Sequence, residues 1–162
     1  WVFHLFLALI LFRHLRYFLY PVPVIIVDWQ TISVTAGFLF PLPALYLFWR
    51  RLALPRTLYI SGLPDYVALL LLTAIAGTGM LVHYYARVYL VDVKAFILGL
   101  LTLSPQPPPL HPIFLTHIAL ICLLLMYFPY SKLMHAGGVF FSPTRNQRDN
   151  VRGRRYINPW DK

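Results

Sequence analysis

Long apolar runs, separated by short polar or proline-containing segments, make up most of this chain. Four of the runs approach the roughly 20 residues that a helix needs to cross the hydrocarbon core of a bilayer. They predict spans from Trp1 to about Tyr20, about Thr31 to Trp49, about Tyr66 to Ala86 and about Pro112 to Tyr130. We expect the second span to be kinked at Pro41 and Pro43, because proline removes a backbone hydrogen bond from a helix.

The segment between the third and fourth spans, residues 88–110, is apolar but is interrupted by Asp92 and Lys94. It predicts a helix that lies in the membrane interface, followed by a stiff turn at the proline-rich residues 105–109. The chain starts inside an apolar run without an initiator methionine, so we expect a fifth span to precede Trp1. The expected fold class is therefore an all-α, polytopic transmembrane helix bundle with four spans here and an interfacial helix.

Composition agrees with a membrane protein and excludes the ordinary soluble globular class. Hydrophobic residues make up 59% of the chain, charged residues 12%, and the mean hydropathy is +0.66. Cys122 is the only cysteine, which excludes a disulfide framework and a cysteine metal cluster. Any metal must therefore be held through histidine. We expect two parts, a transmembrane bundle over residues 1–135 and a basic tail over residues 136–162.

The basic residues are distributed unevenly between the two predicted membrane faces. Lys and Arg together number 14 against five acidic residues, giving a net charge of +9. One face receives ten: Arg50, Arg51, Arg56, Lys132, Arg145, Arg148, Arg152, Arg154, Arg155 and Lys162. The other receives Arg13, Arg16, Arg87 and Lys94. By the positive-inside rule the C-terminus is expected in the cytoplasm, and this membrane-related pattern argues against nucleic acid as a partner.

Four histidines stand near the ends of the first and fourth predicted spans: His4, His14, His117 and His135. Since these spans run in opposite directions, His4 and His135 are expected near the cytoplasm and His14 and His117 near the outer face. At 1.5 Å per residue, the two spacings correspond to about 15 Å along the first helix and about 27 Å along the fourth. Because these lengths differ, one histidine must lie at a helix end or beyond a kink.

Paired imidazoles on facing helices are a ligand set for a haem that only carries electrons, with one imidazole on each side of the iron. Two such haems, one near each membrane face, account for all four histidines. The alternative is interfacial histidines that are bonded to water or headgroups near Arg13, Arg16 and Lys132. The small residues TAIAGTG, 73–79, let a flat group or another helix approach closely, and helix packing is the commoner cause of such a patch.

The histidine spacing, together with the tail SKLMHAGGVFFSPTRNQRDN (131–150) and INPWD (157–161), resembles a known family. It is similar to the dihaem cytochrome b family of the respiratory nitrate reductase gamma subunit. The tail resembles most closely the DsrM membrane subunits of the sulfur-metabolism complex DsrMKJOP. The resemblance covers nearly the whole chain.

This resemblance implies two haem b groups, with His4 and His135 holding the inner one and His14 and His117 the outer one. It further implies five spans, a menaquinol-linked electron carrier in the prokaryotic cytoplasmic (inner) membrane, and a multi-subunit complex. The partner implied is a cytoplasmic iron–sulfur subunit of the heterodisulfide-reductase type.

Polar residues expected at the outer ends of the spans are candidates for a quinone site. Oxidising a quinol releases two protons, so the site needs hydrogen-bonding or basic groups with a route to water. The candidates are His111, His83, Tyr84, Arg13, Arg16 and Asp28. For His83 and His111 an interfacial histidine without this role is an equal alternative, and no motif selects among the candidates.

The expected function is a membrane-bound cytochrome b subunit that exchanges electrons between menaquinone and an iron–sulfur partner, with the chemistry carried by the haems. The alternatives are the nitrate reductase gamma subunit itself and, from another class, a haem-free membrane anchor or a transporter bundle. A transporter typically shows paired broken helices or internal symmetry, and neither is evident. The tail is either a solvated orientation signal or a docking segment anchored by Tyr156 and Trp160.

Overall fold

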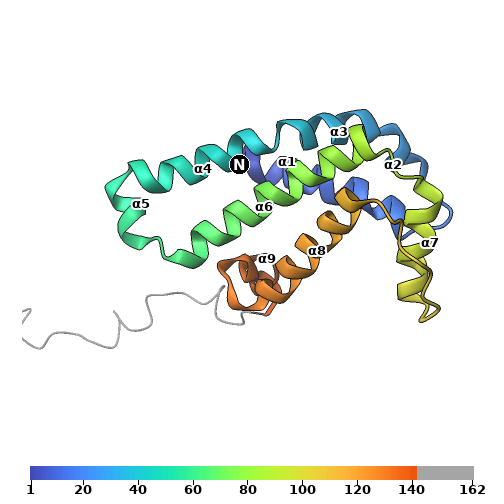
Figure 1. The fold of residues 1–162 in the computed structure, drawn as a ribbon. Helices are drawn as coiled ribbons and strands as arrows, with labels where there is room; N and C mark the ends of the chain where they lie inside the picture. The colour runs from blue at the N-terminus through green and yellow to red at the C-terminus, as the bar shows by residue number, and fades with distance from the viewer. Residues whose placement is uncertain (142–162) are drawn as a thin grey trace, which may run out of the picture.

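The computed structural model describes residues 1–141, and all the regular elements within that range are helices (Figure 1). The predicted all-α class is confirmed. Among the described residues, three helical stretches are long and apolar enough to cross a membrane: Gln30–Ala53, Leu63–Ala86 and Pro112–Tyr130. They correspond to the second, third and fourth predicted spans. The predicted tail beyond residue 141 lies outside the described residues.

The first predicted span is helical over a shorter stretch than its apolar run. Helix α1 (Val2–His14) continues into a single 3₁₀ turn, η1 (Leu15–Tyr17), and ends before Tyr20. Prolines at positions 21 and 23 follow, and a proline disfavours helical backbone in the residue before it. The short helix α2 (Val24–Asp28) comes next.

The second span is interrupted where its prolines predict. Helix α3 (Gln30–Leu39) gives way to α4 (Pro41–Ala53), and Pro41 occupies the first turn of α4, where a missing backbone donor costs nothing. The interruption falls at Phe40, which is 1% exposed and packs with Ala44 and Leu72 in the core. The ring of Phe3 from α1 lies 5.0 Å from that of Phe40. The core therefore sits where α1, α4 and α6 meet.

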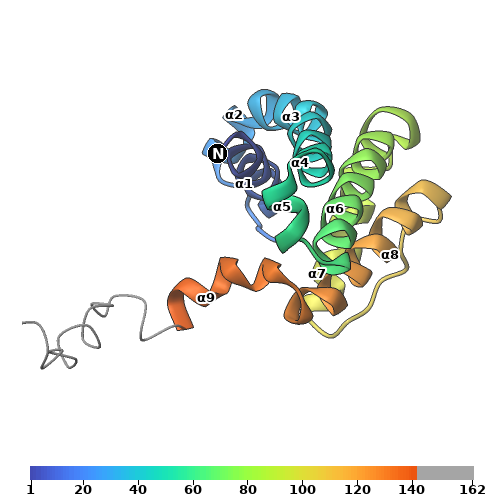
Figure 2. The ribbon, with the colours of Figure 1, turned by 90° about the vertical axis from the view of Figure 1, so that its left-hand side faces the viewer.

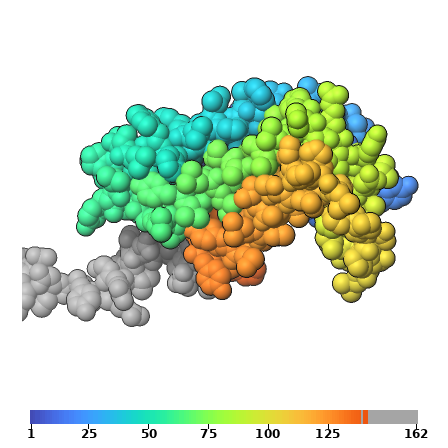
Figure 3. All heavy atoms as spheres, in the orientation of Figure 1, coloured from blue at the N-terminus to red at the C-terminus, as the bar shows by residue number. Residues whose placement is uncertain are grey.

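The third span begins after the short helix α5 (Pro55–Ile60). It comprises α6 (Leu63–Leu81) and one π-helical turn, η2 (Val82–Ala86). The predicted helix in residues 88–110 is present as α7 (Leu90–Leu101). It projects at one end of the elongated molecule and does not run along the long helices (Figures 1 and 3). Lys94 of α7 places its ammonium 4.9 Å from the centre of the Tyr20 ring.

The last span is followed by a bend. Helix α8 (Pro112–Tyr127) leads into two 3₁₀ turns, η3 (Phe128–Tyr130) and η4 (Lys132–Met134), and then into α9 (His135–Phe141). Packing joins α1 to α3, α4 to α6, and α6 to α8. The helices thus follow one another around an arc, and α9 turns back below it (Figure 2). This return brings the beginning of α9 to the beginning of α1.

Candidate functional site

His4 and His135 lie next to each other, although one is near the beginning of the chain and the other opens α9. Their ring centroids are 6.1 Å apart and their planes are 83° from parallel. A metal–imidazole bond is about 2 Å long, so two imidazoles on opposite sides of one iron have centroids roughly 6 Å apart. The separation of the two rings is therefore compatible with a single shared iron. Both residues are exposed.

The orientation of His135 leaves one ring nitrogen free for a metal. Its Nδ1 lies 2.6 Å from the carbonyl oxygen of Lys132. A carbonyl only accepts, so Nδ1 carries the proton and Nε2 keeps its lone pair. His14 has the same arrangement, since its Nδ1 donates to the carbonyl of Ile10 at 2.7 Å. In metal-binding histidines, the N–H of the second ring nitrogen usually donates a hydrogen bond to such a group.

His117 is held by α6, and it is only 9% exposed. Its Nδ1 lies 2.9 Å from Thr78 Oγ1, and the same hydroxyl donates to the Ala74 carbonyl at 2.9 Å. The hydroxyl has one proton and two backbone carbonyls to receive it, those of Ala74 and Ile75, so its oxygen is suited to accept from His117 Nδ1–H. A Cβ added to Gly79 would lie 3.1 Å from His117 Cε1. Thr78 and Gly79 thus fix the ring of His117, again with Nε2 left free.

The structure places the rings of His4 and His135 side by side. The pairing of His14 on α1 with His117 on α8 stays a prediction. The bend through η3 and η4 accounts for the different lengths of the two histidine spacings, because His135 stands beyond the end of α8. Within the small-residue patch 73–79, Gly79 is where α8 packs closely, because an added Cβ would meet His117. At Gly77 no described residue lies within 4 Å of an added Cβ.

The donor set is suited to haem and unsuited to a metal held by protein ligands alone. Structural and catalytic zinc sites take three or four protein ligands. Within residues 1–141 no group of three or more His, Cys, Asp or Glu side chains could hold a metal ion. Two imidazoles per site are sufficient for haem, whose porphyrin supplies the other ligands. Near His135, no other described residue lies within 4 Å of a Cβ added to Gly137 or Gly138.

Several quinone-site candidates lie close together at the C-terminal ends of α1 and α6, the ends predicted to face outward. His83 and Tyr84 are in η2, with ring centroids 4.7 Å apart, and His83 is within electrostatic range of Arg13 and Arg16. Arg16 donates to Gln30 Oε1 at 3.1 Å. The Nε of Arg13 is buried without a hydrogen-bond partner among the described residues. Arg13 itself is half-buried at this end of α1.

The other two candidates have different surroundings. His111 caps the N-terminus of α8, where its Nδ1 accepts from the backbone N–H of Ile113 at 3.3 Å. Asp28 is exposed at the end of α2. Both ion pairs within the described part of the chain involve Asp65 and leave Asp28 out. Sequence reasoning did not single out Asp65, Thr78 or the capping role of His111.

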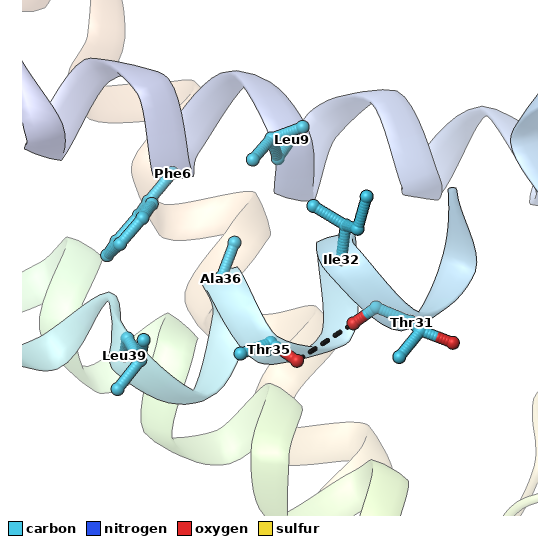
Figure 4. Close-up of a pocket in the computed structure, with 7 residues that line it drawn as sticks. All are labelled: Phe6, Leu9, Thr31, Ile32, Thr35, Ala36 and Leu39. Atoms are coloured by element: carbon cyan, nitrogen blue, oxygen red, sulfur yellow. Dashed lines mark hydrogen bonds between the residues drawn. The ribbon is translucent and has the colours of Figure 1, made fainter.

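A shallow hollow of about 260 Å³ lies between α1 and α3 (Figure 4). Phe6, Leu9 and Ile32 are among its lining residues, and the Thr35 hydroxyl donates to the Thr31 carbonyl at 2.9 Å. No histidine lines it. The hollow can accept an apolar chain or a neighbouring helix, and it does not join the histidine pairs.

Known proteins resemble this chain over nearly all of its length. Residues 1–151 match the nitrate reductase gamma subunit family. The Hdr-like menaquinol oxidoreductase cytochrome b-like subunit of Archaeoglobus fulgidus is 42% identical, over 99% of this chain and 53% of that protein. The protein of the same name from Archaeoglobus profundus is 35% identical, over 99% of this chain and 52% of that protein. The chain thus spans about half the length of these relatives, and no solved structure matches it.

Proposed function

The chain belongs to the nitrate reductase gamma subunit family, and we propose that it is a membrane-bound b-type cytochrome subunit linked to menaquinol. The observation that carries the proposal is the 6.1 Å separation between the rings of His4 and His135. Two imidazoles from opposite ends of the described chain at this separation can hold one iron between them. The names of the Archaeoglobus relatives support the menaquinol assignment.

In this proposal His4 and His135 hold an inner haem, and His14 and His117 an outer one. When bound, the two haems supply one-electron transfer between the membrane faces. The chain's own contribution is to orient the ligands. The carbonyls of Lys132 and Ile10 and the hydroxyl of Thr78 each accept a hydrogen bond from an Nδ1–H, which leaves Nε2 of His135, His14 and His117 available for iron.

Quinol binding is proposed at the outer end of the bundle. A quinol hydroxyl needs an acceptor for its hydrogen bond, and a quinone carbonyl needs a donor. The exposed His83 can accept, and the guanidinium of the half-buried Arg13 can donate. His83 is also exposed, so a proton taken from the quinol has a path to water. Protons are then released outside while the basic end of the bundle faces the cytoplasm.

The partner proposed is a cytoplasmic iron–sulfur subunit of the heterodisulfide-reductase type, within a complex of sulfur metabolism. The Hdr-like names of the relatives and the predicted likeness of the tail to DsrM support this choice. His4 and His135 are exposed near the end that carries Arg51 and Lys132. A site that is open at this end lies within reach of a partner docked on the cytoplasmic face.

The decisive experiment is an optical and electron paramagnetic resonance spectrum of the purified membrane protein. We expect two b-type haems per chain, reduced by a menaquinol analogue. His4→Ala should remove the inner haem only, and His14→Ala the outer haem only. His111→Ala is the matched control, because this histidine caps α8 and should leave both haems in place. Absence of a Soret band would refute the proposal and leave the haem-free anchor or transporter bundle.

A further inference from the structure

Asp65 is a buried carboxylate near the beginning of an otherwise apolar helix. It is 5% exposed and occupies the first turn of α6. A carboxylate in such a place is costly unless it is paired, and ionisable residues within spans usually have a specific role. Asp65 belongs to neither histidine pair and to none of the quinone candidates.

One carboxylate oxygen of Asp65 is contacted by nitrogen atoms from three separate segments. Lys132 Nζ of η4 lies 2.7 Å from Oδ2, the backbone N–H of Gly62 donates to it at 3.1 Å, and Arg51 Nη1 of α4 lies 3.6 Å away. The Lys132 contact is the shortest of the three and has the length of a charge-assisted hydrogen bond. Asp65 therefore ties the turn after α8 to the beginning of α6.

Lys132 connects this ion pair to the histidine pair. Its side chain donates to Asp65, while its carbonyl oxygen accepts from His135 Nδ1 at 2.6 Å. The same residue is thus held from α6 and orients the His135 ring. Ser131 restrains η4 as well, because its Oγ accepts from the backbone N–H of Leu133 at 3.2 Å.

We propose that Asp65 is a positioning residue for the inner haem ligand, acting through Lys132 on His135. This inference rests on the proposed function, since it gives His135 the role of an iron ligand. The hydrogen bond from Nδ1–H to the Lys132 carbonyl makes the imidazole a more basic ligand, which favours oxidised iron. Loosening Lys132 weakens that bond, so the midpoint potential of the inner haem should rise.

The direction in which the inner-haem midpoint potential shifts distinguishes a positioning role of Lys132 from a purely electrostatic effect of its charge. Removing the carboxylate of Asp65 raises the potential under either account. Removing the ammonium of Lys132 lowers the potential if only charge matters, because a nearby positive charge favours the reduced form. If Lys132 positions His135, the same removal raises the potential. Arg51 is the control, because it faces the same carboxylate oxygen but has no bond to His135.

The experiment is a redox titration of each haem in the unaltered protein and in D65N, K132Q, K132R and R51Q. The Lys132 side chain is 70% exposed, so K132Q is expected to fold even where D65N does not. We expect D65N and K132Q to raise the inner-haem potential and shift its ferric resonance signal, with the outer haem unchanged. K132R should restore the unaltered value, and R51Q should lower the inner potential or leave it unchanged.

A lowered inner potential in K132Q, parallel to R51Q, would overturn the proposal and leave a purely electrostatic effect. An unchanged inner haem in both D65N and K132Q would overturn it as well. Absence of haem from the unaltered protein would refute the proposed function instead. The two failures are therefore distinguishable in one set of samples.

Discussion

Replacing Thr78 by valine tests whether α6 sets the properties of the outer haem. Valine has nearly the same shape as threonine but cannot accept a hydrogen bond from His117 Nδ1–H, whose nitrogen lies 2.9 Å from the Thr78 hydroxyl. A net hydrogen bond contributes about 0.5–1.5 kcal/mol. For a one-electron couple 59 mV corresponds to about 1.4 kcal/mol, so losing a bond that favours oxidised iron should raise the outer-haem potential by about 20–60 mV.

The matched control is Thr73→Val on the same helix. Thr73 donates to the Leu69 carbonyl at 2.7 Å, just as Thr78 donates to Ala74, but it makes no bond to histidine among the described residues. Both variants therefore lose the same backbone bond, and only one loses the contact to His117. The assay is a potentiometric titration followed optically. Equal outer-haem potentials in the two variants would refute the role of Thr78.

Three further outcomes follow from the site. His117→Ala should abolish the outer haem and keep the inner one, as counted by haem extraction, and loss of both from a folded protein would contradict the pairing. Gly79→Ala should shift the outer-haem spectrum, because its Cβ would lie 3.1 Å from His117 Cε1. Gly77→Ala is the control, because no described residue lies within 4 Å of the added Cβ, and identical haem spectra for the two variants would count against the Gly79 contact. Removing the residues after Asn146, which lie outside the described range, should release the cytoplasmic partner and leave both haems in place. Copurification tests this, and a partner that still copurifies would leave the tail as an orientation signal only.

The apolar pattern was sufficient to locate the long helices, because burial in lipid demands a fixed length of apolar chain whatever the packing. It also located the interruption at Phe40, since Pro41 and Pro43 act on the backbone locally. The apolar pattern overestimated the length of the helix in residues 1–20. Hydropathy there continues into Phe18, Leu19 and Tyr20, whereas the prolines that follow limit the helix.

The closeness of His4 and His135 was predictable in outline, because antiparallel spans restrict which ends can meet. The unequal spacings required one histidine at a helix end or beyond a kink, and the structure places His135 after the turns η3 and η4. The side chains that orient the rings were not predictable in this way. Thr78 is one of several threonines in apolar helices, and only the packing of α6 on α8 shows that its hydroxyl faces His117. Asp65 offered a usable signal, an acidic residue at the edge of an apolar run, but its partner lies far along the chain.

The arc of helices also has a consequence for the order of assembly. In the proposed pairing α1 shares one iron site with α8 and the other with α9, so the outer site needs α8 to be made and inserted, and the inner site also needs α9. The conformational entropy lost when two segments are joined grows only slowly with the length of the chain loop between them, so joining distant segments costs little more than joining neighbours. A ligand shared by the first and last helices then stabilises the closed arrangement over the open one. Haem insertion would thus be a late event that completes the bundle, and a nascent chain lacking α9 should be a ready substrate for membrane proteases.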